Sequence, residues 1–184
     1  MSTDAKIADG VVTRAGDGRD LIRFERRIAH PIESVWAAIT QPEELIKWWG
    51  NATVDLTAGG EFTLRWLNEG DEGEASALRA RIAELEEPRL LELVGTWGAE
   101  RPDGSFFEQS DTVLRFELEA AGTDTILSFE NTLMFGEEKF RTMVPAGWHF
   151  HLDTLARALD GRSTDLVDVG EQWEPLHEAY VARG

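Results

Sequence analysis

The segment from Phe140 to Gly161 carries an apolar stripe with the spacing of a long helix. At about 100° per residue, one helical face would present Val144, Trp148, Leu152, Leu155 and Leu159. Much of the chain before this segment alternates apolar and polar residues, which is typical of strands with one buried face. A single long apolar helix after a sheet predicts a curved sheet that clasps the helix. Such an arrangement tends to hold a ligand in a cavity rather than to perform one fixed chemistry.

The alternating pattern predicts seven strands, interrupted once by helices. Apolar residues recur at helical spacing after Pro31 and again after Pro42, and a proline suits the first turn of a helix. The expected order is therefore one strand, two short helices, six strands and one long helix. The expected strands cover residues 21–28, 53–56, 62–67, 78–83, 90–97, 112–118 and 125–133.

Two connections between these strands stand out. The acidic, glycine-containing residues 69–74 lack the spacing of a calcium-binding loop and predict a solvated hairpin loop. Residues 99–110 contain a proline and a glycine, and we expect them to form a loop that exposes the pair Phe106-Phe107.

The length and ends of the chain predict one folded domain with two flanking segments. The 184 residues suffice for a single core of ordinary size. Residues 1–19 carry three glycines among charged residues and are expected to be a flexible lead-in. We expect residues 20–162 to form the ligand-binding domain and residues 163–184 to be a tail that packs on it.

The composition argues against several classes of function. The absence of cysteine excludes a disulfide framework, a thiolate metal site and a cysteine nucleophile. A net charge of −17 disfavours binding to nucleic acid or to an anionic membrane. The chain starts without the pattern of a signal peptide and has no apolar run of membrane-spanning length, so we expect a cytoplasmic protein without a membrane span.

With this order of elements, the chain resembles the START-like helix-grip superfamily, also called SRPBCC. Within that superfamily, it resembles the branch related to activators of the 90-kDa heat-shock-protein ATPase. The resemblance covers about residues 20–184. It is carried by HPIESVWAAITQPEELIKWW after the first strand, by Gly59-Gly60 before a Phe-x-Leu-x-Trp strand, by AGWHFHLDTLARALDG and by the tail WEPLHEAYVARG. The fold that it implies is α+β: a curved antiparallel sheet of six or seven strands wrapped around a long C-terminal helix, as in Bet v 1-like proteins, with two short helices after the first strand.

The resemblance also implies a cavity between sheet and helix, and the alternation indicates which residues face it. Each large side chain could instead belong to a packed core, but pockets for small molecules are themselves mostly apolar and aromatic. Three polar residues in or beside these faces are candidates for orienting a ligand: Arg26, Asn131 and His151. The apolar candidates are Phe62, Trp66, Phe116, Phe129, Trp148 and Leu152.

The sequence offers no metal site, no catalytic residue and no cofactor motif. His149 and His151 are two residues apart and would diverge by about 200° on a helix, whereas helical metal ligands are usually three or four residues apart. The serines lack the pattern of a nucleophile elbow, and no phosphate-binding or dinucleotide-binding motif is present.

Three functions remain open from the sequence. We favour a protein that binds a small hydrophobic molecule, either aromatic or lipid-like. The second is an enzyme of the polyketide cyclase or aromatase kind, in which Arg26, Asn131 or His151 would position the substrate. The third is a co-chaperone-like interaction module, which would use the outer sheet or Phe106-Phe107. A homodimer that covers the far side of the long helix is the alternative to coverage by the tail.

Overall fold

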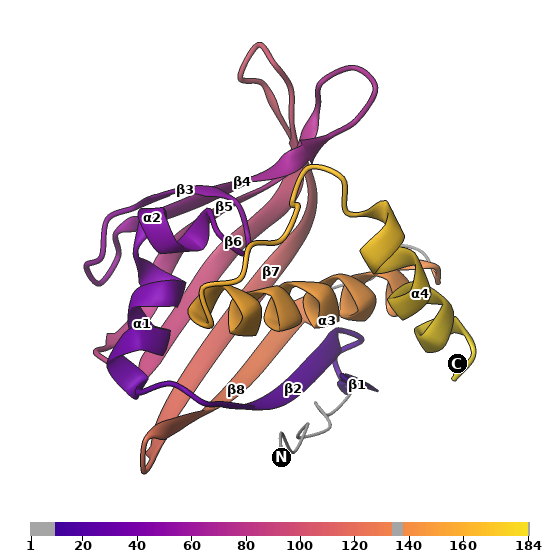
Figure 1. Ribbon diagram of the computed structural model, residues 1–184. Coiled ribbons are helices and arrows are strands. Elements are labelled where there is room, and N and C mark those ends of the chain that lie inside the picture. Colours follow the sequence, from indigo (N-terminus) through magenta and orange to yellow (C-terminus); the bar gives the residue numbers. More distant parts are fainter. Residues whose placement is uncertain (1–9, 134–137, 184) are drawn as a thin grey trace.

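One antiparallel sheet and one long helix dominate the structure, a computed structural model that describes residues 10–133 and 138–183. Helix α3 lies across the concave face of the sheet, and α1 and α2 close one end (Figure 1). The helices are α1 (Ile32–Thr40), α2 (Pro42–Leu45), α3 (Phe140–Leu159) and α4 (Gly170–Val181). The strands are β1 (Val11–Arg14), β2 (Asp20–Ile28), β3 (Asn51–Val54), β4 (Glu61–Glu69), β5 (Ala75–Glu86), β6 (Leu90–Glu100), β7 (Phe106–Ala121) and β8 (Asp124–Leu133).

The strands follow the order β1-β2-β8-β7-β6-β5-β4-β3, and all neighbours are antiparallel. Strands β3 to β8 form a meander, and β2 pairs with β8 to bring the first part of the chain beside the last strand. The α+β helix-grip fold is thus confirmed, with α1 and α2 after β2. The sheet has eight strands in the described residues, one more than the sequence predicted.

The additional strand is β1, which lies inside the segment that we expected to be a flexible lead-in. Val11 pairs with Arg23 and Arg14 pairs with Asp20, so the chain turns back through residues 15–19 and adds an edge strand to β2. The expectation was wrong for residues 11–14. Their side chains are largely exposed, so no alternation marks the strand, and it is the pairing with β2 that orders them.

The segment 99–110 is also different from the expected loop. Strand β6 continues to Glu100, β7 already begins at Phe106, and Glu100 pairs with Phe106 across a short turn. The pair Phe106-Phe107 therefore lies at the start of a strand. The expectation failed because proline and glycine mark only the turn itself, at residues 101–105, while sheet pairing determines the conformation of the flanking residues.

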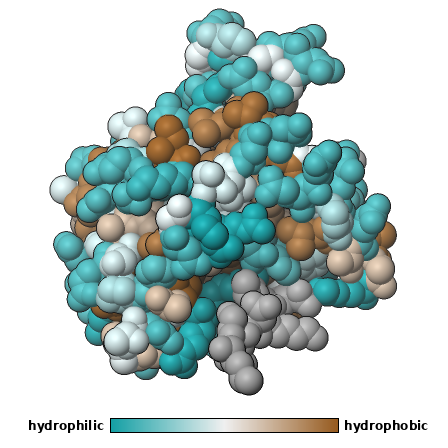
Figure 2. Space-filling view, viewed as in Figure 1, coloured by the Kyte–Doolittle hydropathy of each residue, from teal (hydrophilic) through white to brown (hydrophobic). Residues whose placement is uncertain are grey.

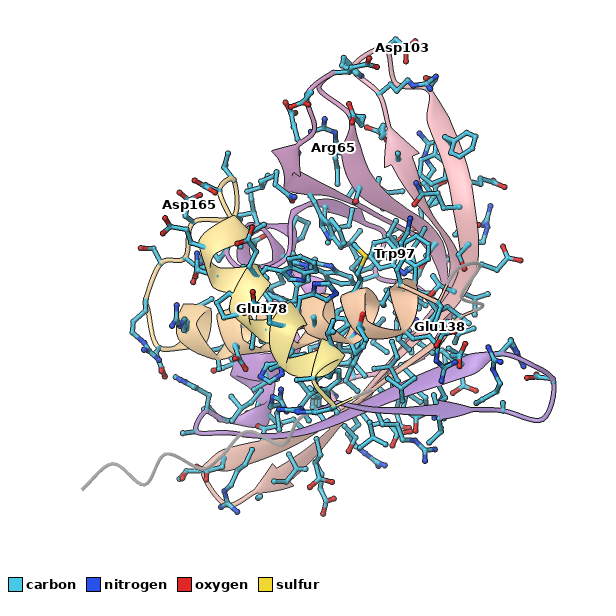
Figure 3. The ribbon with its side chains drawn as sticks, turned by 90° about the vertical axis from the view of Figure 1, so that its right-hand side faces the viewer. Arg65, Trp97, Asp103, Glu138, Asp165 and Glu178 are labelled. Carbon is cyan, nitrogen blue, oxygen red and sulfur yellow. The ribbon has the colours of Figure 1, made fainter. Side chains whose placement is uncertain are left out.

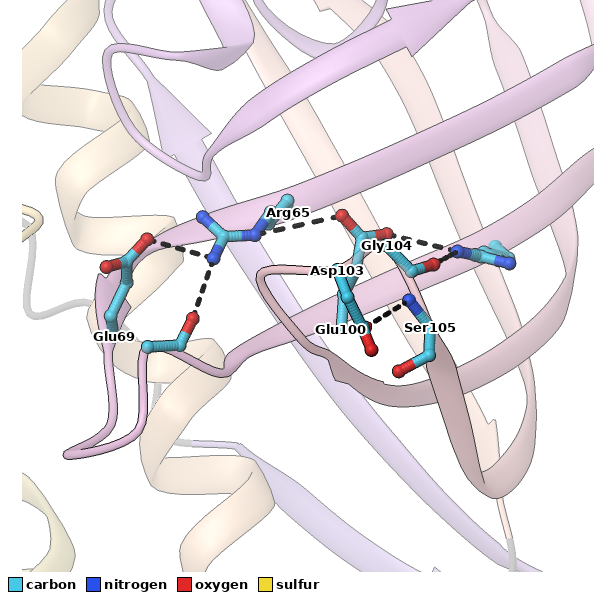
Figure 4. Close-up of polar contacts among 8 residues, drawn as sticks. Arg65, Glu69, Glu100, Asp103, Gly104 and Ser105 are labelled. Carbon is cyan, nitrogen blue, oxygen red and sulfur yellow. Dashed lines mark hydrogen bonds and ion pairs between the residues drawn. The ribbon is translucent and has the colours of Figure 1, made fainter.

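Polar contacts join the hairpin between β4 and β5 to the hairpin between β6 and β7; both project from the body of the protein (Figures 1 and 4). Arg65 on β4 binds Glu69 at 2.9 Å and lies 3.8 Å from Glu100 on β6. Arg79 on β5 reaches the same Glu100 at 3.2 Å. The acidic hairpin is solvated as expected, and Glu100 links it to the next hairpin.

The core lies between the sheet and the helices α1, α2 and α3. Strand alternation places Phe62, Phe116 and Phe129 there, each with no exposed surface. Trp48 and Trp49 follow α2 and stack with ring centroids 5.2 Å apart. Two neighbouring aromatic residues can both be buried because this segment ends in a turn rather than a regular helix.

The C-terminal segment folds back onto α3. Residues 160–169 return from the end of α3, and α4 packs against the first part of α3 (Figure 1). Tyr180 on α4 is buried, and its hydroxyl accepts a hydrogen bond from the backbone N–H of Gly10 at 2.8 Å and pairs with His149 Nδ1 at 3.1 Å. One phenol thus links α4, α3 and the residue that precedes β1.

Replacing Tyr180 by phenylalanine is expected to lower the free energy of unfolding by about 1–2 kcal/mol, because the ring stays while Gly10 and His149 each lose a partner. Urea unfolding followed by circular dichroism measures the change. Val181 is exposed, so Val181→Ala is the control and should change stability by less than ~0.5 kcal/mol. Equal stability of Tyr180→Phe and wild type would contradict the linking role.

Candidate ligand-binding site

A cavity of about 800 Å³ lies between the sheet, α3 and the returning C-terminal segment. This size falls in the range of about 300–1,000 Å³ that is common for small-molecule pockets. Strands β4 to β7 form one wall, α3 forms the floor, and Leu166, Val169 and Trp173 form the cover. On the face shown in Figure 2, apolar side chains gather just below the projecting hairpins.

Aromatic rings make up a large part of the cavity wall. Trp97 points from β6 into the space between the sheet and the helices (Figure 3). Its ring centroid lies 5.5 Å from that of Trp66, 6.3 Å from that of Trp49 and 6.3 Å from that of Trp148. With Trp173, five of the seven tryptophans line this one space. Such a wall presents flat, polarisable faces on several sides.

Helix α3 leaves the cavity open at one position. Gly147 lines it, and a Cβ atom built there would meet no atom within 4 Å apart from its chain neighbours and the adjacent backbone of α3. A glycine inside a helix costs about 0.5–1 kcal/mol relative to alanine. Here it keeps the floor of the cavity flat between Val144 and Trp148, which also line it.

His151 places an imidazole within the aromatic wall of the cavity. Its Nδ1 lies 3.2 Å from the carbonyl oxygen of Trp48, which can only accept, so Nδ1 carries the proton. Burial lowers the pKa of His151 to about 4, against a smaller opposing effect of that hydrogen bond. The imidazole is therefore neutral at pH 7. Its ring centroid lies 5.3 Å from that of Trp66 and 6.0 Å from that of Trp148.

The charge of the cavity lining is low. Among the lining residues that the structure describes, Glu108 and His151 are the titratable ones, and Glu108 is exposed to solvent. No lysine or arginine belongs to this described lining. The remaining polar lining residues are uncharged: Asn68, Ser76, Gln109 and Ser110.

The structure brings three of the nine candidate residues to the cavity: Trp66, Trp148 and His151. Four others lie in the packed core instead, with at most 1% of their surface exposed, and do not line the cavity: Phe62, Phe116, Phe129 and Leu152. Alternation predicted that these side chains point inward, but it does not distinguish a filled region from an empty one.

The remaining two candidates are buried but lie away from the cavity lining. Asn131 has no exposed surface; its amide nitrogen donates to Thr112 at 2.7 Å, and its oxygen accepts from the Trp148 indole at 3.0 Å. Arg26 lies 3.9 Å from Asp153 and packs over the Phe24 ring at 4.9 Å. Asn131 thus joins β8 to β7 and to α3, and Arg26 joins β2 to α3.

Sequence reasoning missed several lining residues. Trp97 could have been found, because it is in phase with the buried Leu91 and Leu93 along the same strand. Phe107 was assigned to a loop, whereas it lies on β7 and is both exposed and part of the lining. Nothing in the sequence marked Leu166, because its position depends on the path of the chain after α3.

Residues 10–133 and 138–183 contain no cluster of three histidine or acidic side chains that could hold a metal ion. None of the helices in that part of the chain combines the length and the hydropathy needed to cross a membrane.

Comparison with solved structures supports the fold. CalU16 from Micromonospora echinospora is 22% identical with a TM-score of 0.67, over 95% of this chain and 96% of CalU16. EF2215 from Enterococcus faecalis, a conserved protein of unknown function, is 15% identical with a TM-score of 0.67, over 95% of this chain and 89% of its own. MLL2253 from Mesorhizobium loti is 22% identical with a TM-score of 0.62, over 78% of this chain and 99% of MLL2253. At these identities the likeness concerns the fold alone.

A search of curated proteins finds no match to the chain. The profile of the family described as "Activator of Hsp90 ATPase homolog 1-like protein" matches residues 29–160, which is well over half of the chain and runs from the end of β2 to the end of α3. Sequence profile and structure agree with the resemblance seen in the sequence. The chain belongs to the family of activator of Hsp90 ATPase homolog 1-like proteins within the SRPBCC superfamily.

Proposed function

We propose that the protein binds a small aromatic molecule in the cavity between the sheet, α3 and α4. The observation that carries this proposal is the volume of about 800 Å³ walled by five tryptophans. Apolar contact contributes ~25 cal/mol per Å² of buried surface, and association itself costs ~4–15 kcal/mol. A ligand must therefore contact much of this wall, which favours a molecule of two or more fused rings.

The properties of His151 favour binding over turnover. A cyclase-type or aromatase-type reaction needs a group that takes up and returns a proton near neutral pH. With a pKa lowered to about 4, the imidazole of His151 is a weak base at neutral pH. Arg26 and Asn131, the other two residues considered for such a reaction, do not belong to the described lining of the cavity.

The test fills the cavity without disturbing its walls. Gly147→Phe should weaken the binding of 2-naphthol at least about tenfold, which corresponds to ~1.4 kcal/mol, because the new ring occupies the open space above the helix. The melting temperature should stay equal or rise, since phenylalanine has the higher helix propensity. Binding is measured by quenching of tryptophan fluorescence and by isothermal titration calorimetry.

Gly147→Ala is the matched control. Its methyl group adds little volume, so binding should stay within about threefold of wild type while stability rises by ~0.5–1 kcal/mol. The proposal fails if Gly147→Phe folds and binds as wild type does. It fails equally if native mass spectrometry of protein from its own source shows no small molecule and a panel of fused aromatic compounds gives no titration.

A further inference from the structure

His151 presents a hydrogen-bond acceptor to the cavity. Because Nδ1 donates to the Trp48 carbonyl at 3.2 Å, the lone pair of the neutral imidazole resides on Nε2. Within the described residues, Nε2 has no hydrogen-bond partner. It is nevertheless not a fully buried atom, so it remains accessible from the cavity side. Since the ring itself lines the cavity, Nε2 opens onto it.

The surroundings of Nε2 indicate the kind of group that would satisfy it. Aromatic rings flank the imidazole, with the centroids of Trp66 and Phe150 each 5.3 Å away. A ligand that fills the cavity displaces water from Nε2, so it must supply a donor of its own or leave a desolvated acceptor unpaired. A phenolic hydroxyl is such a donor, and with a pKa near that of tyrosine, about 10, it remains uncharged at pH 7.

The charges of the lining indicate that the ligand itself is neutral. No lysine or arginine lines the described part of the cavity, so a carboxylate that enters it loses hydration without gaining a counter-ion. The net charge of −17 further disfavours an anion. Glu108 is the one acidic lining residue in the described chain and is exposed, so a cation deep in the cavity would find no buried carboxylate and would depend on the tryptophan faces alone.

We propose that the ligand is an uncharged aromatic molecule whose hydroxyl group donates a hydrogen bond to Nε2 of His151. This inference rests on the proposed function and adds the chemical class of the ligand and the atom that recognises it. Trp66 and Trp148, whose ring centroids lie 5.3 Å and 6.0 Å from that of His151, contact the aromatic faces, and the hydroxyl lies beside the imidazole.

Four probes with one ring system test the inference. 2-Naphthol can donate; 2-methoxynaphthalene has the same ring and oxygen but cannot; 2-naphthoate is anionic; and 2-naphthylmethylamine is cationic at pH 7. Wild-type protein should bind naphthol about fivefold more tightly than the methoxy compound, the ratio expected for one hydrogen bond. Both charged probes should bind at least about tenfold more weakly than naphthol. Titration calorimetry at pH 7 gives the four dissociation constants.

Variants locate the acceptor. His151→Phe should bring the naphthol-to-methoxy ratio to about one, whereas His151→Gln keeps a carbonyl acceptor and should retain part of the preference. His149→Phe is the control, because His149 is buried on the same helix but does not line the cavity, and its ratio should remain as in wild type. A second readout needs no variant. The ¹⁵N chemical shift of Nε2 in wild-type protein should change when naphthol is added and should remain unchanged when the methoxy compound is added.

The outcomes separate the two proposals. If naphthol and the methoxy compound bind equally to wild type and the Nε2 resonance is the same with both, the donor inference is overturned while cavity binding stands. Tighter binding of either charged probe also overturns the inference. If none of the four probes binds, the inference is overturned, and the proposed function fails with it when native mass spectrometry and the panel of fused aromatic compounds are also negative.

Discussion

Replacing Trp148 by alanine is expected to lower the free energy of unfolding by about 4 kcal/mol. The side chain is almost fully buried, its ring centroid lies 4.2 Å from that of Phe129 and 5.3 Å from that of Trp49, and its indole N–H donates to Asn131 at 3.0 Å. Tryptophan-to-alanine changes in cores typically cost ~3–5 kcal/mol. The loss also leaves the oxygen of Asn131, which has no exposed surface, without its donor.

Urea unfolding followed by far-ultraviolet circular dichroism measures this change without relying on tryptophan fluorescence. Trp173→Ala is the matched control, because Trp173 lines the same cavity from α4 but is only half-buried, and it should cost less than half as much. Trp148→Phe keeps an aromatic ring but removes the hydrogen bond and part of the packed volume, with an expected loss of ~1–3 kcal/mol. A loss below ~1.5 kcal/mol for Trp148→Ala would show that this ring is not packed as described.

Acidification is expected to destabilise the protein through His151 by about 3 kcal/mol between pH 7 and pH 4. In the folded protein, burial lowers the pKa of His151 from 6.5 to about 4. Below pH 6.5 the unfolded chain takes up a proton that the folded chain does not, so stability from this group is complete above pH 6.5 and declines as the pH falls towards 4. A difference of about 2.5 pH units at ~1.36 kcal/mol per unit gives the magnitude.

Because carboxylates also titrate in this range, the test is the difference between two proteins. The unfolding free energy of wild type minus that of His151→Gln should fall by about 3 kcal/mol from pH 7 to pH 4 and stay constant from pH 7 to pH 8. Glutamine removes the titrating group and keeps an amide donor for the Trp48 carbonyl. Parallel stability curves for the two proteins between pH 7 and pH 4.5 would contradict a buried, neutral His151.

Much of the fold was predictable because local periodicity reports which side of an element is buried. The two-residue period placed Phe62, Phe116 and Phe129 inward, and the 3.6-residue period did the same for Trp148 and Leu152. The exceptions have a common cause. Strand β1 is an exposed edge strand, and the start of β7 is ordered by pairing with β6, so neither carries a clear local signal of its conformation.

The candidate site was predictable only in part. Trp66, Trp148 and His151 line the cavity, whereas the side chain of Asn131 forms hydrogen bonds with Thr112 and Trp148 instead. A polar residue on an apolar face indicates that a partner exists, but the sequence does not say whether that partner is a ligand or another side chain.

The sequence by itself determined the order of the main elements, the buried faces of most strands and the long helix, and the abundance of aromatic side chains. Tertiary structure alone decided where those side chains leave space. An empty volume is what remains after segments far apart in the chain have packed: Trp97 from the sheet, Gly147 on α3 and Leu166 on the returning segment meet only in the folded protein. Periodicity describes one segment at a time, whereas a cavity forms between several segments and leaves no pattern in any one of them.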